Sequence, residues 1–380
     1  MLLKFAVSLI LASSVLLSGV HAAAGTSCAV STTTTAPTTT SAPPKTTTSK
    51  STATPKPTNA GLPPLPTFPK TFKNPIKPGT GADPWVIYSK KYDTYYLIQS
   101  AGGGLKVHSS RDLTTFGQNV TKVWSTPKDM TGVWAPELDY IDNNWYIYVA
   151  IQTTKENASH RMFVLKGTSD DPQQPFKMVG KITSPDDNWA IDGTVMQYKP
   201  NGALYFIWSG WKDTKSGNEQ NLYIAKMCGP TKICSDRVLL HEPKQKWQRS
   251  GSSGVNEGPE ILVHGDRTFL VYSAAGSWTD NYCLALMGID GGKDPMSPKN
   301  WWRLDDRPVM SSSDTALAPG HASFTTDRKG TPYVVYHAID HKGAGWSGRT
   351  IRTQSFKWNK DGSPWFPQPV GFNTSLPHPA

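Results

Sequence analysis

Short apolar and aromatic runs alternate with turn residues along the chain from about Lys73 onward. Runs such as Tyr95–Ile98 and Leu204–Trp208 are bounded by Gly, Asn, Asp and Lys, which is typical of β-strands. No segment carries the sustained three- and four-residue apolar spacing of a long amphipathic helix. The pattern therefore predicts an all-β fold for residues 73–380.

One pattern recurs five times within this region. It consists of a polar or carboxylate position, an extended segment, a turn and a strand centred on an aromatic residue. The five copies begin at Asp83, Trp134, Asp192, Glu257 and His321, all of which except Trp134 are polar. A repeat of roughly 50–65 residues with three or four strands is typical of a propeller blade. We predict a five-bladed β-propeller, because a β-sandwich or jelly roll of similar length would not repeat the polar position.

The innermost strand of every propeller blade begins near the central axis, so equivalent positions of the five copies converge on one cavity. Each acid alone could be a turn residue: Asp83 precedes a proline, Asp192 precedes a glycine, and Glu257 begins a Glu-Gly-Pro loop. Together they would place like charges side by side, which raises carboxyl pKa values without helping the fold. Such an arrangement is more often functional than structural.

Two carboxyl groups with separated pKa values are the machinery of glycoside hydrolysis. One stays ionised and deprotonates water, and the other stays protonated and protonates the leaving oxygen. A third carboxylate near the acid raises its pKa. The chain has neither the Gly-Xaa-Ser-Xaa-Gly motif of serine hydrolases nor the His-Glu-Xaa-Xaa-His motif of zinc proteases.

Five motifs in order resemble glycoside hydrolase family 43, closest to its exo-acting α-L-arabinofuranosidase branch. They are Ala82–Val86, Trp134–Glu137, Ile191–Thr194, Asn256–Glu260 and Pro319–Phe324. The resemblance implies a five-bladed propeller that acts on arabinans and xylans with inversion of the anomeric centre. It implies that Asp83 is the general base and Glu257 the general acid, and that Asp192 tunes and orients the acid. Inversion predicts that the carboxyl groups of Asp83 and Glu257 lie about 6.5–9.5 Å apart.

Four further residues are candidates for substrate binding: Trp134, Glu137, His321 and Arg349. Trp134 begins an inner strand and could serve as a platform for a sugar ring. By the resemblance, His321 corresponds to a central histidine that often approaches an ion, so a structural calcium or sodium ion in the channel is one option and a hydrogen-bonded core histidine the other. Arg349 corresponds to an arginine that contacts the sugar, with Arg352 as its competitor. No catalytic metal and no cofactor are expected.

The motifs favour release of terminal arabinofuranose from α-1,5-arabinan or arabinoxylan, polysaccharides of the plant cell wall. Endo-α-1,5-arabinanase and β-xylosidase are alternatives with the same chemistry. A non-catalytic carbohydrate-binding propeller would keep the aromatic residues but would have no need for three converging acids.

The N-terminal region differs in composition from the rest. Residues 1–22 have the charged start, apolar run and small-residue end of a signal peptide, and residues 23–72 read as a Ser/Thr/Pro-rich disordered stalk. We therefore expect a secreted monomer. Cys228 and Cys234 could form a local disulfide, whereas Cys283 lies in an apolar run and is predicted to be a buried thiol. The sequons at Asn119, Asn157 and Asn373 are consistent with N-glycosylation.

Charge and hydropathy exclude two classes of partner. The net charge is +10, but half of it comes from five lysines in the first 70 residues, which contain no Asp or Glu. No basic cluster with interleaved aromatics predicts nucleic-acid binding. No segment after the signal peptide is apolar enough to span a membrane.

Overall fold

The computed structural model describes residues 63–215 and 217–380. The predicted signal peptide, residues 23–62 of the predicted stalk and Cys28 lie outside these residues. Within the described ranges, regular structure is almost entirely β-strand, which confirms the all-β prediction. The exceptions are four short 3-10 helices: η1 (Asn157–Ser159), η2 (Lys246–Gln248), η3 (Pro298–Asn300) and η4 (Gly345–Gly348). None of the helices in these ranges is long and apolar enough to cross a membrane.

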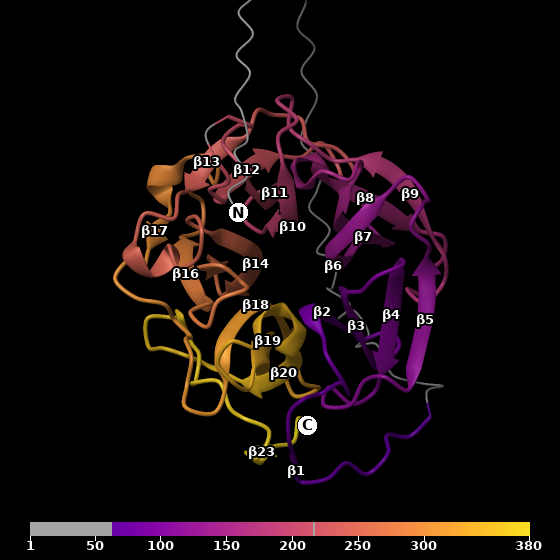
Figure 1. Ribbon diagram of the computed structural model, residues 1–380. Coiled ribbons are helices and arrows are strands. Elements are labelled where there is room, and N and C mark those ends of the chain that lie inside the picture. Colours follow the sequence, from indigo (N-terminus) through magenta and orange to yellow (C-terminus); the bar gives the residue numbers. More distant parts are fainter. Residues whose placement is uncertain (1–62, 216) are drawn as a thin grey trace, which may run out of the picture. The chain divides into compact units, whose positions relative to one another are not determined.

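Five antiparallel sheets surround a central axis, as the repeat predicted (Figure 1). Each sheet is one blade, built from consecutive strands that run from the axis outward. Blade 1 contains β2 (Ala82–Ser89), β3 (Thr94–Ser100), β4 (Leu105–Ser110) and β5 (Asn119–Trp124). Blade 2 contains β6 (Thr131–Ile141), β7 (Asn144–Gln152), β8 (His160–Gly167) and β9 (Phe176–Lys181). Blade 3 contains β10 (Ala190–Tyr198), β11 (Ala203–Gly210), β12 (Asn221–Lys226) and β13 (Val238–His241).

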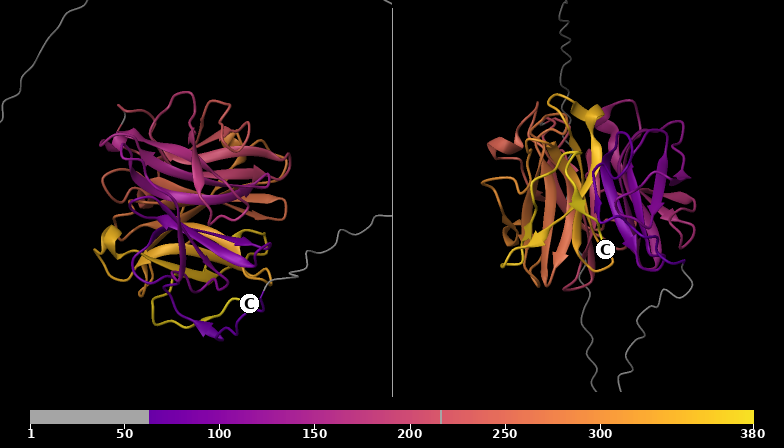
Figure 2. Two further views of the ribbon diagram at one scale, coloured as in Figure 1. Left: turned by 90° about the vertical axis from the view of Figure 1, so that its right-hand side faces the viewer. Right: turned by 90° about the horizontal axis from the view of Figure 1, so that it is seen from below.

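The last two blades have weaker outer edges. Blade 4 contains β14 (Asn256–His264), β15 (Arg267–Ala274), β16 (Cys283–Ile289) and the short β17 (Trp302–Arg303). Blade 5 contains β18 (Leu317–Thr326), β19 (Pro332–Ile339) and β20 (Thr350–Ser355). A separate pair, β21 (Lys357–Trp358) and β22 (Pro364–Trp365), follows it. In side view the strands run roughly parallel to the axis of the ring, so each inner strand begins at one face of the ring and ends at the other (Figure 2).

The hydrophobic core lies between the blades. Each neighbouring pair of blades encloses its own buried cluster, and the five clusters follow one another around the ring. A strand in the middle of a blade is therefore apolar on both faces. In β7, for example, every residue from Trp145 to Ile151 is buried. This explains why the middle strands read as unbroken apolar runs rather than alternating ones.

Blade 5 closes the ring against blade 1 without sharing a strand with it. The Val86 amide of β2 donates to the Ser323 hydroxyl of β18 at 3.1 Å. The Asn74 side chain donates to the Thr353 carbonyl oxygen at 3.1 Å and accepts from the Thr353 amide at 2.9 Å. The closure is therefore a packed and hydrogen-bonded seam between the two ends of the domain.

The two ends of the described chain meet at this seam. Strand β1 (Thr71–Phe72) pairs with β23 (Leu376–Pro377), beside the C-terminus in Figure 1. Phe72 is buried, and Phe68 stacks on His378. We predicted that the stalk extends to residue 72, but these two aromatic side chains pack onto the propeller, so the ordered body begins before that residue.

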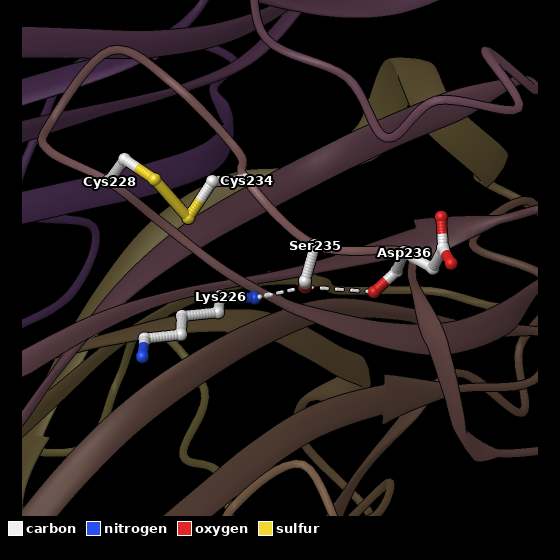
Figure 3. The surroundings of a disulfide bond; sticks show 5 residues. All are labelled: Lys226, Cys228, Cys234, Ser235 and Asp236. Atoms are coloured by element: carbon white, nitrogen blue, oxygen red, sulfur yellow. Dashed lines mark hydrogen bonds between the residues drawn. A yellow bond between two sulfur atoms is a disulfide. The ribbon is translucent and has the colours of Figure 1, made fainter. Parts of the chain in front are cut away.

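The cysteines follow the prediction. Cys228 and Cys234 form a disulfide across the loop that links β12 to β13 (Figure 3). Beside it the Lys226 amide donates to the Ser235 hydroxyl at 2.9 Å, which fixes the base of the loop. Cys283 is a buried free thiol at the start of β16.

Candidate active site

The same backbone irregularity occurs at the inner strand of every blade. Two residues of the inner strand lie opposite one residue of the second strand, which is a β-bulge. The first bulge residue has a left-handed backbone in all five blades: the φ angles are 52° for Asp83, 42° for Ala135, 54° for Asp192, 53° for Gly258 and 48° for His321. Left-handed backbone is unfavourable for residues other than glycine and is often retained at functional sites.

The bulge refines the alignment of the five copies. Asp83, Asp192 and His321 all occupy the left-handed position, so these three are equivalent, as the repeat predicted. Trp134 and Glu257 precede it by one residue, so copies 2 and 4 are offset by one. In blade 4 the left-handed residue is Gly258, whose amide donates to Asp192 Oδ2 at 3.0 Å. The offset thus brings the backbone of blade 4 onto the carboxylate of blade 3.

Asp83 is surrounded by groups that stabilise its charge. Ser100 donates to Oδ2 at 2.6 Å, and Arg349 Nη1 donates to Oδ1 at 3.2 Å. Nδ1 of His321 and Nδ1 of His337 lie 3.4 and 3.5 Å from Oδ1. Burial alone would raise the pKa of Asp83, but these groups together hold it well below its usual range. Burial also lowers the pKa of both histidines, so near neutral pH Arg349 is the cation that keeps Asp83 ionised.

Glu257 has the opposite environment. Burial raises its pKa to about 7, against the opposing effect of the Tyr282 hydroxyl, which donates to Oε1 at 2.8 Å. The nearby Asp83 charge adds to the rise, whereas Arg349 and Ser277 oppose it. Glu257 can therefore hold a proton near neutral pH, where Asp83 cannot.

Asp192 interacts electrostatically with both of these carboxyl groups. Burial and then the charges of Glu257 and Asp83 raise the pKa of Asp192 well above its usual range. Asp192 and Glu257 are therefore a pair that titrates together and keeps a proton where an isolated carboxyl would have lost it. The pKa values of Asp83 and Glu257 are therefore shifted in opposite directions, and their roles as base and acid remain a prediction.

One cavity of about 960 Å³ contains this group. Residues from all five blades line it, including Asp83, Asp192 and Glu257. Trp134 is 40% exposed on its wall and packs against the His160 ring, with centroids 3.9 Å apart and planes tilted by 31°. This placement leaves one face of the Trp134 indole backed by protein and the other available to a ligand.

The remaining predicted substrate residues have different placements. Arg349 and His321 line the cavity. Arg352, the competitor of Arg349, is fully buried and donates to the Val370 carbonyl oxygen at 2.9 Å, so it is a core arginine. Glu137 is buried and is not among the lining residues.

Glu137 belongs to a second layer of carboxyl groups, together with Asp139 and Glu260. One oxygen of each is buried without a hydrogen-bond partner among the described residues. Burial, then the Glu260 and Asp139 charges, raise the pKa of Glu137 well above its usual range. Burial likewise raises the pKa of Asp139 to about 7.

The ion expected near His321 finds no ready set of ligands. Among the described residues no group of three or more His, Cys, Asp and Glu side chains is arranged to hold a metal. His321 Nδ1 faces Asp83 and lies close to Gly258, and Asp83 is the carboxylate beside it. The ion remains a prediction from the resemblance.

Two residues close to the acids were missed by the sequence reasoning. Tyr282 donates to Glu257, and its ring lies parallel to that of His337, with centroids 5.5 Å apart. His337 accepts from the Asp83 amide at 3.2 Å. Neither stands at the start of an inner strand, which was the only position the repeat singled out. The Gly320 preceding His321 was a usable signal, because a Cβ there would lie 2.0 Å from the Tyr282 ring.

Sequence comparison relates this site to known enzymes. The family model of Glycosyl hydrolases family 43 matches residues 72–364. The chain is similar to the extracellular exo-α-(1→5)-L-arabinofuranosidase of Streptomyces avermitilis, with 31% identity over 79% of this chain and 64% of that protein. It is also similar to α-L-arabinofuranosidase B of Pyricularia oryzae, with 35% identity over 68% of this chain and 54% of that protein. The chain thus spans between about half and two thirds of the length of these relatives.

Structural comparison gives the same relationship. The crystal structure of an α-L-arabinofuranosidase from Lactobacillus brevis superposes with a TM-score of 0.73 and 30% identity, and the match covers 80% of this chain and 98% of that one. With the family match over residues 72–364, the five bulged inner strands and the three cavity carboxyl groups, the chain belongs to glycoside hydrolase family 43.

Proposed function

We propose that the protein is a secreted, monomeric, inverting α-L-arabinofuranosidase that releases terminal arabinofuranose from α-1,5-arabinan or arabinoxylan. The observation that carries the proposal is the single cavity that residues of all five blades enclose around Asp83, Asp192 and Glu257. We expect a cavity lined by residues of all five blades to accept the end of a chain, whereas an endo-acting cleft must be open at two opposite sides. The names of the Streptomyces and Pyricularia relatives support arabinofuranose as the sugar, and the first supports secretion.

The proposed reaction follows from the two carboxyl environments. Asp83, held ionised by Arg349, takes a proton from a water whose oxygen attacks C1 of the terminal arabinose. Glu257 gives its proton to the glycosidic oxygen as the C1–O bond breaks. The products are arabinose with inverted configuration at C1 and a chain shortened by one residue. Asp192 titrates together with Glu257, which helps to keep a proton on the pair, and Trp134 offers a platform for the sugar ring.

Product analysis with the full chain tests the proposal. Linear arabinan, debranched arabinan, arabinoxylan and xylo-oligosaccharides are incubated with the protein and followed by proton NMR. We expect arabinose as the first and sole product, formed initially as the β-anomer. A ladder of arabino-oligosaccharides would mean endo cleavage, xylose would mean a β-xylosidase, and binding without products would mean a non-catalytic propeller.

The separate roles of the acids can be tested with two substrates. Glu257→Gln should lower kcat on α-1,5-arabinobiose by about 10²–10⁴-fold, because the alkoxide leaving group needs a proton. On α-L-arabinofuranosyl fluoride the loss should be much smaller, because fluoride leaves without one. Asp83→Asn should lose both activities. Glu156→Gln, at an exposed loop position, is the matched control; equal losses on both substrates for Glu257→Gln would show that Glu257 is not the acid.

A further inference from the structure

Two exposed tryptophans form a corner on the cavity wall. Trp278 follows β15 of blade 4 and is 36% exposed, and Trp346 lies in η4 of blade 5 and is 59% exposed. Their rings meet edge to face, with centroids 6.0 Å apart and planes at 79°. Two exposed aromatic rings in contact on a cavity wall form a contiguous apolar surface, which is typical of a binding site.

The surrounding backbone is built to hold the corner in place. The Trp278 indole covers Gly276 and Gly251, where a Cβ would lie 2.7 and 2.9 Å from its ring atoms. The Trp346 indole N–H donates to the Ser277 hydroxyl at 3.1 Å. The Gly343 amide donates to Asp280 Oδ1 at 2.9 Å, which ties the loop of blade 5 to that of blade 4. These contacts fix both rings although each presents a face to solvent.

The corner also connects to both catalytic carboxyl groups. Ser277, which accepts from Trp346, also lies close enough to the Glu257 carboxyl to lower its pKa. The Trp346 carbonyl oxygen accepts from Arg349 Nε at 3.2 Å, and Arg349 Nη1 donates to Asp83. The corner is therefore linked through Ser277 to Glu257 and through Arg349 to Asp83.

We propose that Trp278 and Trp346 form the subsite for the leaving-group sugar, the second residue of the chain being cleaved. This inference rests on the proposed function. Sugar rings expose C–H groups on one face and bind aromatic rings through it, while their hydroxyl groups need polar partners. Ser252, Ser253 and Ser277 also line the cavity and have hydroxyl groups that could serve as such partners. The corner is then a specificity element, which accepts the saccharide that remains after arabinose departs.

The test compares two substrates that share the terminal arabinose and differ in the leaving group. α-1,5-Arabinotriose presents a second sugar, whereas α-L-arabinofuranosyl fluoride presents none. Trp346→Ala should lower kcat/KM on arabinotriose about tenfold and on the fluoride less than about twofold. Trp346→Phe should restore most of the arabinotriose activity. Trp365→Ala removes a tryptophan that is 49% exposed outside the cavity and serves as the control.

The outcomes separate this inference from the proposed function. Equal losses on both substrates would place Trp346 against the terminal arabinose or in the support of Asp83, and unchanged arabinotriose hydrolysis would remove it from binding; either result overturns the subsite. Failure of the wild-type protein on both substrates would instead overturn the proposed function, and the subsite with it. Thermal unfolding of each variant confirms that losses do not come from misfolding, and Trp278→Ala provides a second, independent probe of the corner.

Discussion

At the scale of single residues, the site depends on keeping two buried carboxyl groups at different pKa values. Arg349 and Ser100 hold Asp83 ionised, while burial keeps a proton on the pair of Asp192 and Glu257. Glu257 is buried and the Asp83 side chain is only 12% exposed, so the difference in pKa comes mainly from their partners and not from solvent. The hydroxyl of Tyr282 is the partner whose removal should change Glu257 with the least disturbance.

Tyr282→Phe should move the alkaline limb of the kcat/KM profile to higher pH by about one unit. The hydroxyl stabilises the ionised form of Glu257, so its loss raises the pKa of the acid and keeps it protonated further into the alkaline range. The acidic limb, set by Asp83, should stay in place. The profile is measured on α-1,5-arabinobiose, with Tyr140→Phe at an exposed position as control. An alkaline limb that stays fixed would show that Tyr282 only packs against Glu257.

At the scale of elements, the bulge at the start of each inner strand determines which residues reach the axis. The bulge occurs in all five blades, although only three blades have a polar residue at the left-handed position. A left-handed backbone costs roughly 1–2 kcal/mol for an L-residue other than glycine. Blades 2 and 4 provide a matched pair, because Ala135 and Gly258 occupy the same position with φ angles of 42° and 53°.

Gly258→Ala should destabilise the protein by about 1–2 kcal/mol, whereas Ala135→Gly should change its stability by less than about 0.5 kcal/mol. The new Cβ at Gly258 is strained by its φ angle and lies 3.1 Å from the His321 ring. In Ala135→Gly, the folded state gains stability because glycine tolerates the φ angle of 42°, and this gain offsets the entropy that glycine adds to the unfolded state. The measurement is urea-induced unfolding followed by tryptophan fluorescence. Equal effects of the two substitutions would mean that the bulge is not under the same strain in both blades.

The bulge also marks where sequence reasoning succeeded and where it stopped. The repeat predicted five blades and brought Asp83, Asp192 and Glu257 to one cavity, because a repeated pattern fixes the phase of each strand. It did not predict the one-residue offset at Trp134 and Glu257, since a bulge is a backbone event that leaves no periodic signal. Tyr282 and His337 were missed because their contacts join different blades, and a repeat describes each blade by itself.

At the scale of the whole molecule, the five blades enclose a central channel that carries more buried acid than the reaction uses. Glu137 is 4% exposed, and its Oε2 has no hydrogen-bond partner among the described residues. Its carboxyl group lies near Asp139 and Glu260 in the second layer, all with raised pKa values. A buried carboxyl with a raised pKa binds more protons in the folded than in the unfolded state, so it destabilises the fold as pH rises.

Glu137→Gln should therefore make the protein more stable in alkaline solution and change little in acid. The unfolded glutamate loses its proton near pH 4.3, whereas the folded one keeps it to a much higher pH, so the loss of stability accumulates from about pH 4.3 upward. Glutamine keeps the shape but cannot ionise. Thermal unfolding between pH 5 and pH 8.5 should show a gain of about 1–3 kcal/mol at the alkaline end.

Glu156→Gln, at an exposed loop, should leave the pH dependence unchanged. The stability of Glu137→Gln should still fall as pH rises, but less steeply than that of the wild type, because Asp139, Asp192 and Glu260 also have raised pKa values. If Glu137→Gln had the same slope as the wild type, Glu137 would have to be neutralised by something other than a proton. A cation in the channel would then be the simplest neutraliser, and dialysis against a chelator should restore the predicted slope in the wild-type protein.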